Sequence, residues 1–289
     1  MKGPCTPMLF RRIAKFAGAD LPPIVSAIRL SGVIAASAVG RRGLSLETLA
    51  EPIERAFALP DVSAVALIIN SPGGSPVQSA LIAGRIRQLS AEKSVPVLAF
   101  VEDVAASGGY WLACAADEIV ADPASIVGSI GVISAGFGFQ HAIAKLGVER
   151  RVYTSGTSKS MLDPFQPEKP EDVAHLKGLQ EEVHDGFRQW VRARRGARLE
   201  GQDTAALFSG AFWSGARAKE LGLVDRLGDM RSTLRERFGE KVRIHVVNPT
   251  RRPGLGRFIG LDSRALSADL ADGLIDAAEQ RSIYARFGL

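Results

Sequence analysis

The sequence predicts an α/β fold built around a parallel sheet. Short runs of apolar and β-branched residues alternate along the chain with stretches of helical pattern. These runs are apolar at successive positions, which is typical of strands that are buried on both faces of a sheet. With 289 residues, of which 46% are hydrophobic, the chain is also long enough to bury a sizeable core.

Four segments are predicted as strands, at residues 24–30, 64–70, 95–101 and 118–121. A helix is expected between the second and the third, because Ser75 suits the N-cap and Pro76 suits the first helical position. Ile82, Ile86 and Leu89 then form an apolar stripe at helical spacing. This strand–helix–strand unit implies a right-handed parallel crossover.

Two more helices and one ambiguous segment follow. A long helix is predicted from Pro170 to Arg195, and a short one within 213–225 that stops at Gly222. A charge-free run of 22 residues, Pro123–Ala144, has the length of a membrane span. Its glycines, its polar residues and its leading proline instead favour a buried strand-and-loop segment of the core.

The chain divides into three parts by composition. Residues 1–21 form an N-terminal tail, in which 8–17 have the pattern of a short basic amphipathic helix suited to a membrane surface. Residues 22–247 form the main domain, and residues 248–289 are interpreted as a linker with a helical extension. The sequence shows no secretory signal and no transmembrane helix, which predicts a cytoplasmic location or a peripheral one on the inner membrane.

Charge, cysteine content and motifs narrow the function classes. The net charge of +5 is compatible with an anionic membrane surface, but no aromatic-interleaved basic stripe is present, so nucleic-acid binding is not expected. Cys5 and Cys114 have no metal-ligand spacing and indicate no disulfide framework. A GxxxxGK[ST] motif is also lacking. We therefore expect no metal, no nucleotide and no other cofactor.

Two glycine-rich stretches each follow a predicted buried strand. In "INSPGG", Ile69–Gly74, adjacent glycines let the backbone approach a ligand closely, and N–H groups near a helix start suit an anion. In "AASGG", Ala105–Gly109, Ser107 opens a helical run and its small neighbours leave room for a carbonyl group. Taken alone, the first stretch also fits an ordinary turn, and Ser107 also fits a helix cap.

A nucleophilic serine needs a base, because its hydroxyl is unreactive at its ordinary pKa. The four histidines (141, 175, 184 and 245) lie in no suggestive setting and are interpreted as surface or packing residues. The alternative is a lysine that burial keeps neutral. Lys159 lies among small hydroxyl residues in "VYTSGTSKSMLDPF", and its nearest acid is Asp163. Alone, it also fits an ordinary surface-loop lysine.

Taken together, these stretches resemble the signal peptide peptidase A (SppA) family of serine proteases. The resemblance is carried, in order, by "INSPGG", "DVAASGGYWLACAADEIVA", "GSIGV", "SGTSKSMLDPF" and "FSGAFWSGARAKELGLVD", and it covers about residues 22–240. It implies a single-copy domain with a Clp/crotonase-like α/β fold of repeated ββα units. It also implies a Ser–Lys dyad and peptide substrates, such as signal-peptide remnants or other small or unfolded peptides.

The resemblance further implies a role for particular residues. Ser107 matches the nucleophile, Lys159 the general base, and Ser129 the serine that positions the lysine amine. Gly74 and Gly108 match the amides of the oxyanion hole. Single-copy relatives form homo-oligomeric rings in which neighbouring subunits complete each dyad, so we expect the same here. Many members carry an N-terminal transmembrane helix, which this sequence lacks.

Three alternatives are weighed against this reading. Clp-type proteases place a histidine about 25 residues after the serine, but position 132 is Val132 and the nearest following histidine is His141. A crotonase-type acyl-CoA enzyme shares the fold but uses carboxylate acids and bases, and it needs neither Ser107 nor Lys159. A catalytically inactive, membrane-associated scaffold needs none of the three site side chains. The sequence therefore favours acyl transfer by a serine endopeptidase.

Overall fold

The computed structural model describes residues 21–36, 43–247 and 281–289. Three predictions fall outside these ranges, namely the amphipathic helix at 8–17, the linker after Val247 and the body of the helical extension. None of the helices in the described ranges combines the length and the hydropathy that a membrane span requires.

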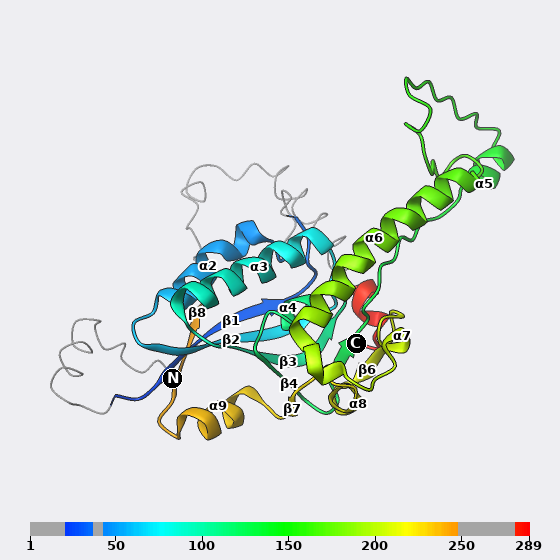
Figure 1. The fold of residues 1–289 in the computed structure, drawn as a ribbon. Helices are drawn as coiled ribbons and strands as arrows, with labels where there is room; N and C mark the ends of the chain where they lie inside the picture. Colours follow the sequence, from blue (N-terminus) through cyan, green and yellow to red (C-terminus); the bar gives the residue numbers. More distant parts are fainter. Residues whose placement is uncertain (1–20, 37–42, 248–280) are drawn as a thin grey trace, which may run out of the picture.

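An eight-stranded, mostly parallel sheet forms the centre of the molecule (Figure 1). Its main path runs in the order β6-β5-β3-β2-β1-β8, and β4 pairs with β3 and β7. Only β5 and β6 pair antiparallel among these strands. The predicted α/β class with a parallel sheet is therefore confirmed. The strands are β1 (Ile24–Ser31), β2 (Val62–Ser71), β3 (Val97–Ala106), β4 (Glu118–Ala121), β5 (Ile126–Gly128), β6 (Phe212–Ser214), β7 (Arg226–Leu227) and β8 (Arg243–Val247).

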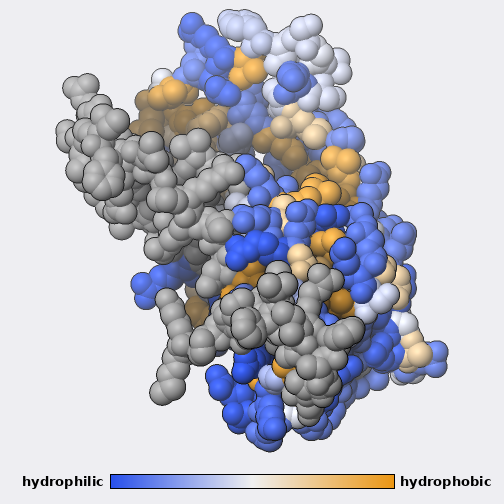
Figure 2. Space-filling model, turned by 90° about the vertical axis from the view of Figure 1, so that its left-hand side faces the viewer, coloured by the Kyte–Doolittle hydropathy of each residue, from blue (hydrophilic) through white to orange (hydrophobic). Residues whose placement is uncertain are grey.

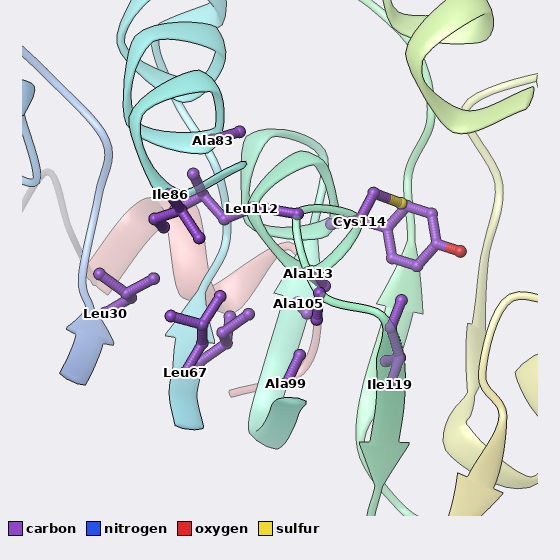
Figure 3. Close-up of a cluster of buried hydrophobic side chains, with 14 of the residues drawn as sticks. Leu30, Leu67, Ala83, Ile86, Ala99, Ala105, Leu112, Ala113, Cys114 and Ile119 are labelled. Atoms are coloured by element: carbon purple, nitrogen blue, oxygen red, sulfur yellow. The ribbon is translucent and has the colours of Figure 1, made fainter. Parts of the chain in front are cut away.

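Helices cover both faces of this sheet and exclude water from it. The larger apolar cluster joins one face to α2 (Leu46–Ala58), α3 (Pro76–Lys93) and α4 (Gly108–Ala113), while α9 (Met230–Phe238) packs on the other. Because strand residues alternate between faces, β2 sends Leu67 to the first cluster and Ile68 to the second. Figure 3 shows side chains of α3 and α4 facing strand side chains, among them Ile86, Leu112, Leu67, Ala99 and Ile119.

The predicted crossover between β2 and β3 is present. Ser75 caps α3 by accepting the Gln78 amide, and Pro76 occupies the first helical turn. Ile82, Ile86 and Leu89 are all buried, as the stripe predicted. The short helix predicted within 213–225 is α8 (Gly215–Glu220), but its first residues belong to strand β6 instead. Besides α5 (Gln140–Lys145), the remaining short helices are α7 (Thr204–Leu207) and the 3₁₀ turn Gly196–Leu199.

A long helix, α6 (Pro170–Arg195), projects from the body as an arm (Figure 1). It has the predicted bounds. Its 26 residues correspond to about 39 Å of helix. The chain between β5 and α6 runs along this arm and carries α5 near its outer end. The prediction that 123–144 is a buried core segment is therefore wrong beyond Val132, because this stretch follows the arm outward and leaves Phe137 80% exposed.

Polar side chains cover much of one face of the molecule. Figure 2 shows one face that is largely hydrophilic, with hydrophobic residues in separate patches. Ion pairs such as Arg29–Glu102 and Arg85–Glu54 lie on the exposed surface. Exposed pairs of this kind contribute little to stability, so the fold depends mainly on its apolar clusters.

One buried ion pair fastens the base of α6 to the body. The Arg195 guanidinium, only 2% exposed, binds both carboxylate oxygens of Asp225 and the Gly222 carbonyl. Burial alone would raise the pKa of Asp225, but hydrogen bonding and charge from Arg195 outweigh it and lower that pKa. Nearby, burial raises the pKa of Cys114 to about 12, so this thiol is an inert core group.

We predict that Asp225→Asn lowers the free energy of unfolding by about 3–5 kcal/mol, because it leaves the Arg195 charge buried and uncompensated. The pKa of Asp225 is lower in the folded state than in the unfolded state. Its contribution to folding stability is therefore fully present at pH values above the pKa of an unfolded aspartate. That contribution is lost as the pH falls through the folded-state pKa. Denaturant unfolding at several pH values should show that wild type loses more stability on acidification than the variant does.

The matched control is Glu220→Gln, which removes the exposed partner of Arg217. We expect a change of about 0–1 kcal/mol there. Equal losses in both variants would contradict a special role for the buried pair.

Candidate active site

Four of the five predicted site residues meet at one edge of the sheet. Strands β2 and β3 are adjacent and parallel, so the stretches that follow them emerge side by side. The first stretch carries Gly74, and the second carries Ser107 and Gly108. Strand β5 lies on the other side of β3, and Ser129 follows it directly. The carboxyl edge of a parallel sheet is where α/β proteins usually bind ligands.

Ser107 has a backbone conformation that few side-chain-bearing residues adopt. Its φ is +51° and its ψ is −121°, at the sharp turn from β3 into α4. A serine on a strained strand-to-helix turn is typical of nucleophiles that a substrate must reach. The backbone holds it there through two bonds, because the Ser107 amide donates to the Gly128 carbonyl and the Trp111 amide donates to the Ser107 carbonyl.

The Ser107 hydroxyl is available for chemistry. It makes no capping bond to α4, so the alternative of a helix cap is not what the structure shows. The residue is half-buried, and no hydrogen bond is found to its Oγ within the described parts of the chain. A hydroxyl without such a bond in a water-accessible turn can donate its proton to an incoming base.

The two glycine stretches lie so close together that the Gly74 and Gly108 amide groups are neighbours. A methyl group on Gly73 would lie 2.7 Å from the Gly108 nitrogen and 2.8 Å from the Ser107 Cβ. A methyl group on Gly108 would lie 3.3 Å from the Gly74 nitrogen. Neither the Gly74 nor the Gly108 amide has a hydrogen-bond partner among the residues that the structure covers. Two neighbouring N–H groups of this kind beside a serine can stabilise a negatively charged oxygen.

Ser71, a site residue that the sequence pattern does not indicate, holds the first stretch in place. Its hydroxyl donates to the Gly32 carbonyl at 2.7 Å and accepts the Gly73 amide at 3.2 Å. The Ile34 amide donates to the Gly73 carbonyl, and the Ser75 amide donates to the Ile34 carbonyl. The glycine turn is thereby tied to the chain that follows β1. No local pattern indicates this role, because the Gly32 carbonyl that Ser71 binds lies 39 residues away in the sequence.

Ser129 lies beside the same turn. It follows Gly128, whose carbonyl accepts the Ser107 amide, and its own amide donates to the Ala211 carbonyl at 2.7 Å. Its φ of +54° marks a second tight turn. The residue is half-buried. Ser107 and Ser129 are therefore connected through a single backbone hydrogen bond between their strand ends.

Lys159 does not join these residues within one chain. It is exposed, in the segment between α5 and α6 at the outer part of the arm (Figure 1). Two hydrogen bonds show how far the Lys159 segment lies from Ser107 along α6. The amide of Leu162, three residues after Lys159, donates to Asp172. The Trp190 Nε1 donates to the carbonyl of Trp111, four residues after Ser107. Asp172 and Trp190 lie 18 residues apart on α6, about 27 Å along its axis.

The surroundings of Lys159 leave it without a partner carboxylate. Asp163, its nearest acid in sequence, pairs instead with Arg150. No ion pair to Lys159 is found in the described ranges, and no cluster of potential metal ligands is found there either. Among the histidines, His184 has its Nε2 within hydrogen-bond distance of the Ile130 carbonyl.

Comparison with known proteins identifies the family. The model of peptidase family S49 matches residues 90–241, more than half of the chain. The chain belongs to peptidase family S49. The predicted resemblance to the SppA peptidases is thus confirmed, and the matched range contains Ser107, Ser129 and Lys159.

Three relatives illustrate how the match is distributed. A protein of Brucella abortus named as a Na⁺/H⁺ antiporter, NhaA, is 51% identical over 273 residues, which are 92% of this chain but 37% of that protein. A protein of Synechocystis sp., named only as a candidate protease, is 32% identical over 86% of this chain and 87% of its own length. The chloroplastic serine protease SPPA of Arabidopsis thaliana is 32% identical over 64% of this chain and 27% of its own.

We predict that Gly108→Ala destabilises the protein by about 1–3 kcal/mol, as overpacking does. The new methyl group would lie 2.5 Å from the Ser79 Oγ in α3. Removing that oxygen with Ser79→Ala should shrink the cost of Gly108→Ala, which a double-mutant cycle of unfolding free energies measures.

Gly84→Ala in α3, the helix that carries Ser79, serves as the control. Nothing lies within 4 Å of its added methyl group, so it should raise stability by about 0.5–1 kcal/mol. A cost of Gly108→Ala that is independent of Ser79 would contradict the close packing described.

Proposed function

We propose that this protein is a serine endopeptidase that uses a Ser–Lys dyad. The observation that carries the proposal is the Ser107 hydroxyl on a strained turn beside the Gly74 and Gly108 amides, all three without a hydrogen-bond partner among the described residues. Membership of peptidase family S49 supports the same reaction class. The substrates are peptides, either signal-peptide remnants or other small or unfolded chains. No cofactor, metal or nucleic acid takes part.

The reaction is acyl transfer in two stages. The neutral Lys159 amine accepts the Ser107 proton while Oγ attacks the peptide carbonyl carbon. The Gly74 and Gly108 amides bind the resulting oxyanion, and one such donor contributes roughly 3–4 kcal/mol. The protonated lysine then gives its proton to the leaving amine as the C–N bond breaks. Water, deprotonated by the same lysine, hydrolyses the ester and restores Ser107.

Lys159 reaches the serine of a neighbouring subunit in this proposal. Within one chain, the arm holds the lysine segment about 27 Å of helix away from the contact between α6 and α4. A proton can pass only across hydrogen-bond distance. The site is therefore incomplete in a single chain, and a homo-oligomeric ring that places one arm over the next site completes it.

The surface of the arm suits such an assembly. Large apolar side chains gather along the segment from β5 to α6, with Tyr153 91% exposed and Ile133 65% exposed. Exposed apolar surface of this extent typically marks an interface. Other members of the group are Phe137, Phe139, Leu146, Val148 and Phe165. In the ring, burial of this surface against the next subunit would also desolvate the lysine and favour its neutral form.

Ser129 is proposed to position the incoming amine. It directly follows Gly128, whose carbonyl accepts the Ser107 amide, so Ser129 lies beside the turn that carries the nucleophile. A hydroxyl at this point accepts a hydrogen bond from the neighbour's lysine and orients its lone pair toward Ser107. Peripheral membrane contact through residues 8–17 stays a prediction.

We predict that a fluorophosphonate probe labels the assembled wild-type protein at Ser107. Ser107→Ala should abolish labelling, because the nucleophilic oxygen is gone. Lys159→Ala should slow labelling by about 10²–10⁴-fold, the usual contribution of a general base, with partial recovery at high pH where hydroxide replaces it. Gel fluorescence over time at several pH values measures these rates.

Lys177→Ala, on the exposed face of α6, is the matched control and should label like wild type. An assembled wild-type protein that never labels would contradict the peptidase proposal and would favour an inactive scaffold. Unchanged labelling of Lys159→Ala would remove the lysine from the mechanism.

We predict that mixed rings of Ser107→Ala and Lys159→Ala subunits regain activity. A Lys159→Ala subunit still has its serine, and a Ser107→Ala subunit still has its lysine. Where the two are neighbours in the right order, the site between them contains both residues. Peptide cleavage should therefore rise above that of either variant alone after subunits have exchanged. Native mass spectrometry confirms the exchange, and inert mixtures of exchanged subunits would count against dyads formed between chains.

A further inference from the structure

A segment far along the chain docks at the edge of the sheet that holds the candidate site. Residues 281–289 begin with a short helical stretch, 281–285. The Tyr284 hydroxyl donates to the Asn70 carbonyl at 3.0 Å, and the Phe287 ring meets the Phe212 ring edge-on with centroids 5.2 Å apart. We call residues 281–289 the strap.

The two anchors of the strap lie on opposite sides of the candidate site. Asn70 is at the carboxyl end of β2, and Phe212 is in β6. The strand order is β6-β5-β3-β2, so the ends of β5 and β3 lie between the anchors. Those two ends lead into Ser129 and Ser107. Three strand spacings are about 14 Å, a distance that one helical turn with two aromatic side chains can bridge.

One side of the strap is partly covered. Ile283, Tyr284 and Phe287 are half-buried, whereas Arg281 and Arg286 are exposed. Figure 1 shows the strap helix in red, beside β6 and α7. Burial raises the pKa of the Tyr284 hydroxyl, which is consistent with a docked rather than a solvated side chain.

The receiving surface is held rigidly. The Asn70 side chain donates to the Asp103 carboxylate at 2.6 Å, and the Gly32 amide donates to the same Asn70 carbonyl that Tyr284 uses. Asn70 immediately precedes Ser71 in the glycine turn of the site. A contact on Asn70 therefore lies within a few residues of Gly74.

We propose that the strap crosses the mouth of the candidate active site and must leave before a peptide can bind there. The inference rests on the proposed peptidase function. A peptide whose carbonyl is to meet Ser107 and the two amides has to lie over the ends of β3 and β5, between Asn70 and Phe212. The strap occupies that span, so strap and substrate compete for one surface.

The test compares full-length variants with the fluorophosphonate probe extended by a short peptide. Tyr284→Phe removes only the hydroxyl, and labelling of Ser107 should accelerate by about five-fold, the factor of one neutral hydrogen bond. Phe287→Ala removes the ring contact, and labelling should accelerate by about ten-fold or more. Arg286→Ala, on the exposed side of the strap, should label like wild type.

Deuterium uptake of residues 281–289 supplies a readout that does not depend on catalysis. The strap should be protected in wild type, less protected in Phe287→Ala, and unprotected once the peptidyl probe occupies Ser107. A strap that is unprotected in wild type would overturn the proposal. A protected strap with equal labelling rates in all variants would also overturn it and leave the peptidase proposal intact.

A third outcome separates the two proposals. If Phe287→Ala releases the strap but no variant labels at Ser107, the peptidase proposal fails, and the gating role fails with it.

Discussion

The close backbone contact between the Gly73–Gly74 turn and the start of α4 is the constraint on which the candidate site depends. A methyl group on Gly73 would lie 2.7 Å from the Gly108 nitrogen, and one on Gly74 would lie 2.0 Å from the Ile34 carbonyl oxygen. Their φ values of +101° and +140° also favour glycine. The Gly74 and Gly108 amides, which have no hydrogen-bond partner in the described ranges, can lie side by side only because no side chain separates the two turns.

The parallel sheet brings this contact about. Strands β2 and β3 pair from Val65–Val97 to Ser71–Ala105, with one shift of register after Ile69, so both turns leave the sheet at the same edge. Apolar helices on both faces fix the strands, and the edge alone remains open for polar groups. The strain at Ser107 is held by the surrounding core, since α4 behind it is almost entirely buried. The packing of the core therefore determines the geometry of the site.

The sequence predicted the parts of the fold that local patterns determine. Apolar runs and helix caps predict the strands at 24–30 and 118–121, the helix after Ser75 and the helix at 170–195. Glycines at strand ends predict the two stretches that form the site. The arm was missed, because an apolar run such as 123–144 indicates burial but not whether its own chain or another covers it. The Tyr284 contact with Asn70 spans 214 residues, and no local pattern reports it.

Rigidity of α6 links the body of the protein to the remote lysine. At its base, Arg195 is fixed to Asp225, Arg194 donates to the Cys114 carbonyl, and Trp190 donates to the Trp111 carbonyl. The last two bonds attach the helix to α4, whose first residues follow Ser107. A helix of about 39 Å converts a small change of angle at this base into a displacement of several ångströms at its tip. In the proposed ring, the position of Lys159 over a neighbouring serine would therefore depend on buried bonds that touch neither residue.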